Sequence, residues 1–260
     1  MTHRPASPHV GLFVTCLVDA MRPSIGFASL KLLEDAGCIV GIPEAQTCCG
    51  QPAFNSGADG HARDIVKQVI AAFEHFDYVI VPSGSCAGML KVQATELFEN
   101  DDDWRQRHAA VADKTYEIMS FLTDVMEYVP KGVQCPASAT YHDSCSGLRE
   151  LGIHDQPREL LSHVDGLSLK ALRGSDACCG FGGTFCVKYP DISNQIVADK
   201  AREITNTGAD LLLAGDLGCL MNMAGKLNRD GAPVRAYHAI EILAGMADEP
   251  AICEPERESS

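Results

Sequence analysis

Two Cys-Cys-Gly corners, TCCGQP at 47–52 and ACCGFG at 177–182, constrain this chain more than any other feature. Neighbouring cysteines point their sulfurs in different directions, so one tetrahedral ion suits both thiolates poorly, whereas two irons of a cluster can each bind one. Gly50 and Gly180 would let the backbone turn and approach an inorganic core without a Cβ in the way. A vicinal disulfide is the alternative, but the ring that it closes is strained. The corners therefore predict iron–sulfur clusters.

Each corner belongs to a set of four cysteines with nearly the same spacing. There are 31 residues between Cys16 and Cys48 and 32 between Cys145 and Cys178. After each pair, 36 residues precede Cys86 and 39 precede Cys219. Agreement between two sets indicates that one structural unit was duplicated together with its ligands. The predicted metal ligands are Cys16, Cys48, Cys49, Cys86, Cys145, Cys178, Cys179 and Cys219.

The apolar pattern predicts an α/β fold made of two tandem, pseudo-symmetric domains, each with a Rossmann-like parallel sheet. The first domain is expected over 1–133 and the second over 134–247, with the boundary within a linker at 128–137; each is long enough for a core of its own. An acidic tail at 248–260 is expected to be disordered. Expected strands are 10–15, 38–43, 78–82, 139–142, 167–172, 210–214 and 233–236, and one long solvated helix is expected over 101–126.

All eight predicted ligands would lie in turns that follow strands. In a parallel α/β sheet these turns gather at the carboxyl ends of the strands, where helix N-termini point positive partial charge at an anion. The same partial charge lowers thiol pKa values, which favours ligation.

Charge and composition limit the partners. The net charge is 21 − 35 = −14, which argues against nucleic acid or an anionic membrane as a partner. We expect no membrane span and no export signal, because no window approaches 18 apolar residues. Twelve cysteines in a chain that does not need disulfides indicate a reducing compartment, so we expect a cytoplasmic protein.

Four cysteines lie outside the repeat. Cys38 is expected in the core, Cys135 and Cys253 are expected to be free surface thiols, and Cys186 is close enough to Cys179 to be a spare ligand.

Two histidines lie near the expected site. His142, in YHDSC at 141–145, is the candidate catalytic and cofactor-binding residue, because it could hydrogen-bond a cluster sulfur or handle a substrate proton. A structural role, in which His142 stabilises the turn, is an equally good interpretation of this residue. For His238 a structural role at the start of the last helix is favoured.

These motifs resemble the cysteine-rich CCG domain that occurs twice in the B subunit of heterodisulfide reductase and in the iron–sulfur subunit of glycolate oxidase. Over residues 10–246 the chain is most similar to the lactate utilization protein A family. The matching stretches are QTCCGQPAFNSG, VPSGSCAGM, TYHDSCSGLRELG, ACCGFGGTFCVKYPDIS and GDLGCLMNM. The reductase has a further cysteine in each set where this chain has Ser83 and Asp216, so four thiolates per repeat fit a [4Fe-4S] cluster better than a five-thiolate one.

The resemblance implies an oxidoreductase component that is active in a multi-protein complex. It would be the iron–sulfur subunit of an L-lactate dehydrogenase system, oxidising L-lactate, a small 2-hydroxy acid, to pyruvate. Its partners would be a companion iron–sulfur protein and a third subunit. The chain has no ferredoxin-type cysteine run and no dinucleotide fingerprint, so a partner must supply any further relay. The alternatives are a cluster-based thiol–disulfide reductase subunit, a glycolate or 2-hydroxy-acid oxidase subunit, and a non-catalytic zinc or scaffold protein.

Overall fold

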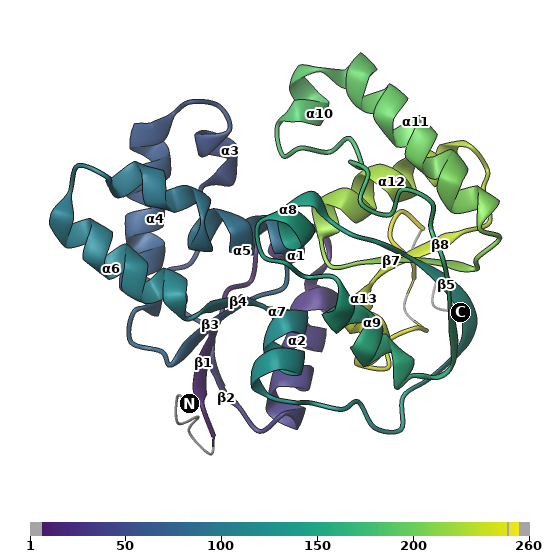
Figure 1. The fold of residues 1–260 in the computed structure, drawn as a ribbon, viewed down its shortest axis with the longest axis horizontal. Coiled ribbons are helices and arrows are strands. Elements are labelled where there is room, and N and C mark those ends of the chain that lie inside the picture. Colours follow the sequence, from purple (N-terminus) through teal and green to yellow (C-terminus); the bar gives the residue numbers. More distant parts are fainter. Residues whose placement is uncertain (1–6, 249, 255–260) are drawn as a thin grey trace.

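The computed structural model describes residues 7–248 and 250–254, and in them two four-stranded sheets are entirely parallel (Figure 1). The first has the order β2-β1-β3-β4 and the second the order β6-β5-β7-β8, so the two sheets have the same topology. This confirms the predicted α/β fold with two tandem, pseudo-symmetric units. The strands are β1 (His9–Leu12), β2 (Ile39–Gly41), β3 (Tyr78–Val81), β4 (Thr115–Glu117), β5 (Gln134–His142), β6 (Asp165–Lys170), β7 (Leu211–Ala214) and β8 (Arg235–His238).

Helices connect the strands in both halves (Figure 1). No helix in the described ranges is long and apolar enough to cross a lipid bilayer. The α-helices are α1 (Cys16–Met21), α2 (Pro23–Asp35), α3 (Gln51–Phe54), α4 (Asp59–Phe73), α5 (Gly84–Lys91), α6 (Asp102–Asp113), α7 (Ile118–Ser120), α8 (Cys145–Arg149), α9 (Asp155–Ser162), α10 (Phe185–Lys188), α11 (Pro190–Asn206), α12 (Leu217–Arg229) and α13 (Ala239–Leu243). A 3₁₀ helix (Gln93–Phe98) follows α5 and a π-helical turn (Phe121–Val125) follows α7.

The first sheet is buried on both faces, because alternate residues of its central strands enter different cores. Val79 and Val81 of β3 pack in a cluster with the apolar stripe of α4, whereas Ile80 between them belongs to a second cluster with α2. Strands buried on both faces read as continuous apolar runs, which is why β1 and β3 could be predicted from the sequence.

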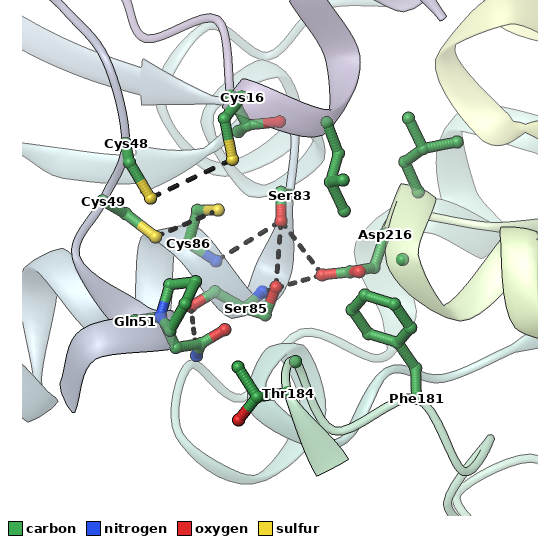
Figure 2. A pocket seen from close by; sticks show the side chains of 16 residues that line it. Cys16, Cys48, Cys49, Gln51, Ser83, Ser85, Cys86, Phe181, Thr184 and Asp216 are labelled. Atoms are coloured by element: carbon green, nitrogen blue, oxygen red, sulfur yellow. Dashed lines mark hydrogen bonds between the residues drawn. The ribbon is translucent and has the colours of Figure 1, made fainter. Parts of the chain in front are cut away.

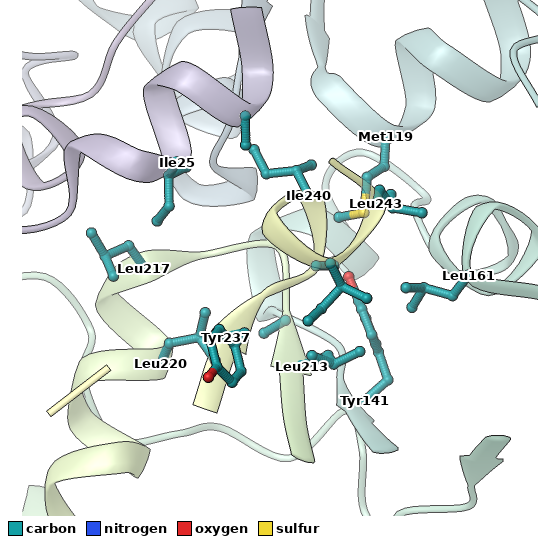
Figure 3. Packing of buried hydrophobic residues seen from close by; sticks show 14 of the residues in the cluster. Ile25, Met119, Tyr141, Leu161, Leu213, Leu217, Leu220, Tyr237, Ile240 and Leu243 are labelled. Carbon is teal, nitrogen blue, oxygen red and sulfur yellow. The ribbon is translucent and has the colours of Figure 1, made fainter. Parts of the chain in front are cut away.

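The second cluster spans both halves of the chain. It joins Ile25 of α2 to Leu217 of α12 and Ile240 of α13, and α13 packs against α2 (Figure 3). The buried residues of the cluster around α4 come from the first half, and Leu151 of the second half packs against them. The two halves therefore share a core, in addition to the cluster around α4.

A buried ion pair reinforces this contact. Arg22 Nε donates to Glu241 Oε1 over 2.8 Å, and Ser24 Oγ donates to the same oxygen over 2.7 Å. The other oxygen of Glu241 accepts the amide of His238, and the Glu241 side chain is fully buried. His238 thus has the favoured structural role, as the N-cap of α13 in a reciprocal capping box.

The expectation of one long helix over 101–126 is wrong. Helix α6 ends at Asp113, and β4 follows at the edge of the first sheet, paired with β3. Thr115 is fully buried there. Pairing with β3 overrides the local helical pattern. The charged residues of α6 continue that pattern up to the strand, so the sequence alone does not indicate where the helix ends.

The expected linker at 128–137 is also partly wrong. Strand β5 already begins at Gln134, and an irregularity in its pairing with β6 lies between Gln134 and Ala137, around Pro136. Proline removes a ladder donor, so it is tolerated at such an irregularity. Cys135 is consequently buried and is not the expected surface thiol. Cys38 is buried and Cys253 exposed, as expected.

Part of the expected tail at 248–260 packs on the second sheet. Ala251 and Ile252 are buried, and the amide of Ile252 donates to the carbonyl of Ala236 over 2.9 Å. Residues 249 and 255–260 lie outside the described residues.

Candidate metal centres

The four cysteines of the first set converge on one cavity (Figure 2). Cys16 begins α1, Cys48 and Cys49 precede α3, and Cys86 lies in the first turn of α5. The Sγ atoms of Cys16 and Cys48 are 3.9 Å apart, and those of Cys49 and Cys86 are 3.4 Å apart. Thr15 Oγ1 caps α1, which fixes the turn that presents Cys16.

The glycine after each cysteine pair has a left-handed backbone. The φ angle is +89° at Gly50 and +84° at Gly180. The amide of Gly50 donates to Cys48 Sγ over 3.5 Å, and the amide of Gly180 donates to Cys178 Sγ over 3.3 Å. The two corners therefore repeat the same turn, in which a backbone N–H faces the first sulfur of the pair.

We expect Gly180→Ala to lower the free energy of unfolding more than Gly50→Ala. Both changes put a side chain on left-handed backbone, at a cost of roughly 1–2 kcal/mol. At Gly180 the added Cβ would also lie 2.8 Å from the carbonyl oxygen of Ser193, whereas at Gly50 the nearest atom is 3.4 Å away. Urea unfolding of both variants beside the wild type measures the difference. Equal losses would contradict the steric part of this argument.

The second set occupies the matching positions in the second half. Cys145 begins α8, Cys178 and Cys179 follow β6, and Cys219 lies in the first turn of α12. Cys145 and Cys178 are exposed, whereas Cys179 and Cys219 are buried. The Sγ atoms of these two buried cysteines and one ring nitrogen of His142 all lie within 4.8 Å of one another.

The shifted pKa values of the cysteine thiols indicate that each set needs a bound cation for all of its thiols to ionise. In the first set the hydrogen bond from Cys16 lowers the pKa of Cys48, while the pKa values of Cys16 and Cys49 are raised by their contacts with Cys48 and by burial. In the second set hydrogen bonding to Cys179 and burial raise the pKa of Cys178. Crowded thiols ionise together only when a metal replaces their protons, so this donor set fits a thiolate-bound metal group.

Comparisons with known proteins agree with this geometry. The family model described as "Cysteine-rich domain" (CCG) matches residues 10–91 and 139–224. Lactate utilization protein A of Anoxybacillus flavithermus is 47% identical over 235 residues, which cover 90% of this chain and 98% of that protein. The protein of the same name from an Exiguobacterium species is 47% identical over 238 residues, covering 91% and 97%.

The chain belongs to the lactate utilization protein A family. A solved structure of a hypothetical protein from Helicobacter pylori has a similar fold, with a TM-score of 0.63 at 12% identity, covering 94% of this chain and 52% of that one.

Sequence reasoning did not assign roles to Ser83 and Asp216 in this family member. Each is the N-cap of the helix that carries the last cysteine of its set: Ser83 Oγ accepts the amide of Cys86 over 3.3 Å, and Asp216 Oδ1 accepts the amide of Cys219 over 3.4 Å. Ser83 Oγ also donates to Asp216 Oδ2 over 3.0 Å, and the amide of Ser85 donates to the same oxygen over 3.0 Å (Figure 2). Serine and aspartate are preferred N-caps, so a helix-start signal was present.

The walls of the first cavity come from both halves of this lactate utilization protein A homologue. The cavity has a volume of about 200 Å³, and Leu217 of the second half contributes to its lining. Phe181 and Thr184 of the second half face the first cysteine set (Figure 2). Among the residues that the structure describes, its lining includes the Asp216 carboxylate but no lysine, arginine or histidine.

Cationic groups lie beside the second set instead. Lys200 is almost fully buried, and its Nζ donates to the carbonyls of Gly174, Ser175 and Ala177, the loop that leads into Cys178. Cys186, the other candidate ligand of this half, donates a weak hydrogen bond from Sγ to the carbonyl of Gly183 over 3.7 Å.

A buried carboxyl group lies near the junction of the halves. Glu117, at the end of β4, accepts the amides of Met119 and Ser120 at Oε2, and its Oε1 has no hydrogen-bond partner among the described residues. Burial raises the pKa of Glu117 to about 8.

We expect Glu117→Gln to flatten the dependence of stability on pH between about 4.5 and 8. The pKa of Glu117 is higher in the folded chain, so the folded state retains a proton that the unfolded state has lost. The stabilisation is complete below the unfolded pKa and decreases as pH rises through the folded pKa, by at most about 1.4 kcal/mol per pH unit. Denaturation of both proteins across this range provides the measurement. Parallel curves would contradict a protonated Glu117.

Proposed function

We propose that this chain is the iron–sulfur redox subunit of a system that oxidises L-lactate to pyruvate, and that it passes the electrons to a partner. The observation that carries the proposal is the pair of four-cysteine sets at equivalent strand ends of a lactate utilization protein A family member. Oxidation of lactate to pyruvate releases two electrons and two protons. Two one-electron centres match that number.

The proposed cofactors are two [4Fe-4S] clusters, one for each set. Cys16, Cys48, Cys49 and Cys86 would hold the first, and Cys145, Cys178, Cys179 and Cys219 belong to the second. Bound clusters would accept and release single electrons. The residues of this chain would supply the thiolates, the amides of Gly50 and Gly180 directed at a sulfur, and the helix N-termini near Cys86 and Cys219.

The proposed partners are a companion iron–sulfur protein and a third subunit. The sequence lacks a ferredoxin-type cysteine run and a dinucleotide fingerprint, so this chain alone would have no route to a nicotinamide. Lactate itself would bind on this chain or on a partner.

A glycolate or 2-hydroxy-acid oxidase subunit would use the same cysteine sets, and substrate tests decide between it and lactate oxidation. A thiol–disulfide reductase on a five-thiolate cluster is less well supported. At the two positions of the extra cysteine, Ser83 and Asp216 are engaged in capping hydrogen bonds.

The test is anaerobic purification followed by an iron count, an absorption spectrum and a lactate-dependent dye-reduction assay. We expect a brown protein that does not reduce dye or nicotinamide with lactate alone, and that becomes active when its two companion proteins are added. Full activity of the isolated chain would contradict the subunit role, and His142 would then be the first residue to mutate. A colourless protein containing zinc would contradict the redox role altogether.

A further inference from the structure

The two cysteine sets have different residues three positions before their first cysteine. Phe13 lies three residues before Cys16, and His142 lies three residues before Cys145. Phe13 is fully buried and packs against Phe73, with ring centroids 5.6 Å apart. His142 is only 1% exposed, yet its Nε2 has no hydrogen-bond partner among the described residues. The second half thus has a buried polar atom where the first half has a hydrocarbon.

The hydrogen bonds around His142 determine which nitrogen carries the proton. Its Nδ1 lies 3.1 Å from the carbonyl oxygen of Ser175, and that oxygen also accepts the Nζ of Lys200 and the amide of Asp143. A carbonyl only accepts hydrogen bonds, so Nδ1 must be the protonated nitrogen. Nε2 therefore presents a lone pair, and it cannot donate to a sulfur.

His142 lies beside the two buried cysteines of the second set. One of its ring nitrogens and the Sγ atoms of Cys179 and Cys219 lie within 4.8 Å of one another, and all three residues are buried. Because Nδ1 donates to the carbonyl of Ser175, Nε2 is the nitrogen that remains available to a metal. Histidines that bind metals commonly donate their other ring N–H to a backbone carbonyl, as His142 does to Ser175.

We infer that His142 Nε2 is a direct metal ligand in the second set, so that the second centre has mixed nitrogen and sulfur ligands and the first has sulfur alone. The inference rests on the proposed function, in which both sets bind iron. It assigns His142 a ligand role instead of hydrogen bonding to a cluster sulfur. A cluster with four ligand positions would then leave one cysteine of this set unbound, and the exposed pair, Cys145 and Cys178, offers the spare thiol.

His238 shows the opposite arrangement. Its Nδ1 accepts the amide of Ile240 over 3.4 Å, so the proton resides on Nε2. His238 is buried in the same half, but it presents an N–H and cannot bind a metal through that atom. The lone pair of His142 is therefore not a general property of buried histidines in this fold.

Nitrogen ligation would separate the two centres in reduction potential. A neutral imidazole in place of a thiolate removes one negative charge, and histidine ligation raises the potential of iron–sulfur centres. The second centre would therefore be the easier one to reduce, and electrons would collect there. Its exposed cysteines place that centre close to the surface from which a partner could accept them.

Pulsed electron paramagnetic resonance of the dithionite-reduced protein tests this inference. We expect one of the two cluster signals to show the coupling of a directly bonded imidazole nitrogen, and this coupling to change when the protein is made with ¹⁵N-histidine. The signal of the first set is the internal control, because no histidine among the described residues lines its cavity. If the second set binds a cluster but its spectrum does not change with ¹⁵N-histidine, the inference is overturned and the proposed function is not. Absence of iron from the second set would overturn the proposed function as well.

His142→Phe copies the first half and gives a second measurement. We expect the cluster to persist on four thiolates, the nitrogen coupling to disappear, and the potential of the second centre to fall. We expect the ratio of reduced first centre to reduced second centre to rise by about tenfold or more. A tenfold change in this ratio corresponds to about 59 mV for a one-electron couple. An unchanged potential would contradict direct ligation. Because the isotope experiment uses the wild-type chain, the inference remains testable if this variant does not fold.

Discussion

Replacing Cys48 by Ser is expected to remove about half of the bound iron and to leave the second cluster in place. Cys48 Sγ faces Cys16 Sγ and accepts the amide of Gly50. Its loss would remove a thiolate that contacts both a second ligand and the backbone of the corner. Cys179→Ser should produce the reciprocal result, because Cys179 is buried beside Cys219 and His142. Each change would remove about four of about eight irons if each set holds one [4Fe-4S] cluster.

The measurement is iron per chain after anaerobic purification, combined with the resonance spectrum that shows which signal is lost. Cys253→Ser is the matched control, because Cys253 is exposed and lies outside both sets. Its iron content should equal that of the wild type. If Cys48→Ser or Cys179→Ser emptied the protein of iron, one cluster shared between the halves would replace the model of two.

Arg22→Met is expected to lower the free energy of unfolding by about 3–5 kcal/mol, the usual cost of removing one partner of a buried ion pair. Arg22 is the cationic partner of the fully buried Glu241 carboxylate, and the pair joins the N-cap of α2 to α13. Its Nη1 also donates to the carbonyl of Pro250 over 2.7 Å. Without the guanidinium, a negative charge would remain in the core that the two halves share.

The double variant Arg22→Met/Glu241→Gln should recover part of this loss, because it removes the unpaired charge. Arg202→Met is a surface control, since Arg202 and Asp199 form an exposed pair that should contribute at most about 1 kcal/mol. Chemical denaturation of the four proteins measures these differences. A loss at Arg22 no larger than that at Arg202 would show that the contact between the halves does not depend on this pair.

The sequence predicted the parts of the fold that are encoded locally. The apolar runs that became β1, β3 and β7 are buried, and the cysteines follow strand ends because parallel strands bring their carboxyl ends to one edge. The edge strand β4 was missed because only its pairing with β3 makes it a strand.

The composition of the candidate site could be predicted only in part. The cysteine sets repeat in sequence, so their grouping was visible, although their ligand role stays a prediction. No sequence signal indicates that Phe181 and Thr184 would face the first set from the other half, since that contact depends on how the halves pack. The lone pair of His142 depends on the carbonyl of Ser175, 33 residues away, and only the folded chain shows it.

The hydrogen bond between Ser83 and Asp216 makes each half of the chain depend on the other at the contact between them. The two residues occupy equivalent positions and meet where the halves meet, one as donor and one as acceptor. Two copies of the second half joined in the same way would place two carboxylates against each other, and like charges at that distance repel. Two copies of the first half would lose the carboxylate that holds Ser85. The two halves are thus complementary at this contact. A symmetric dimer of two first halves or of two second halves would lack the hydrogen bond between Ser83 and Asp216.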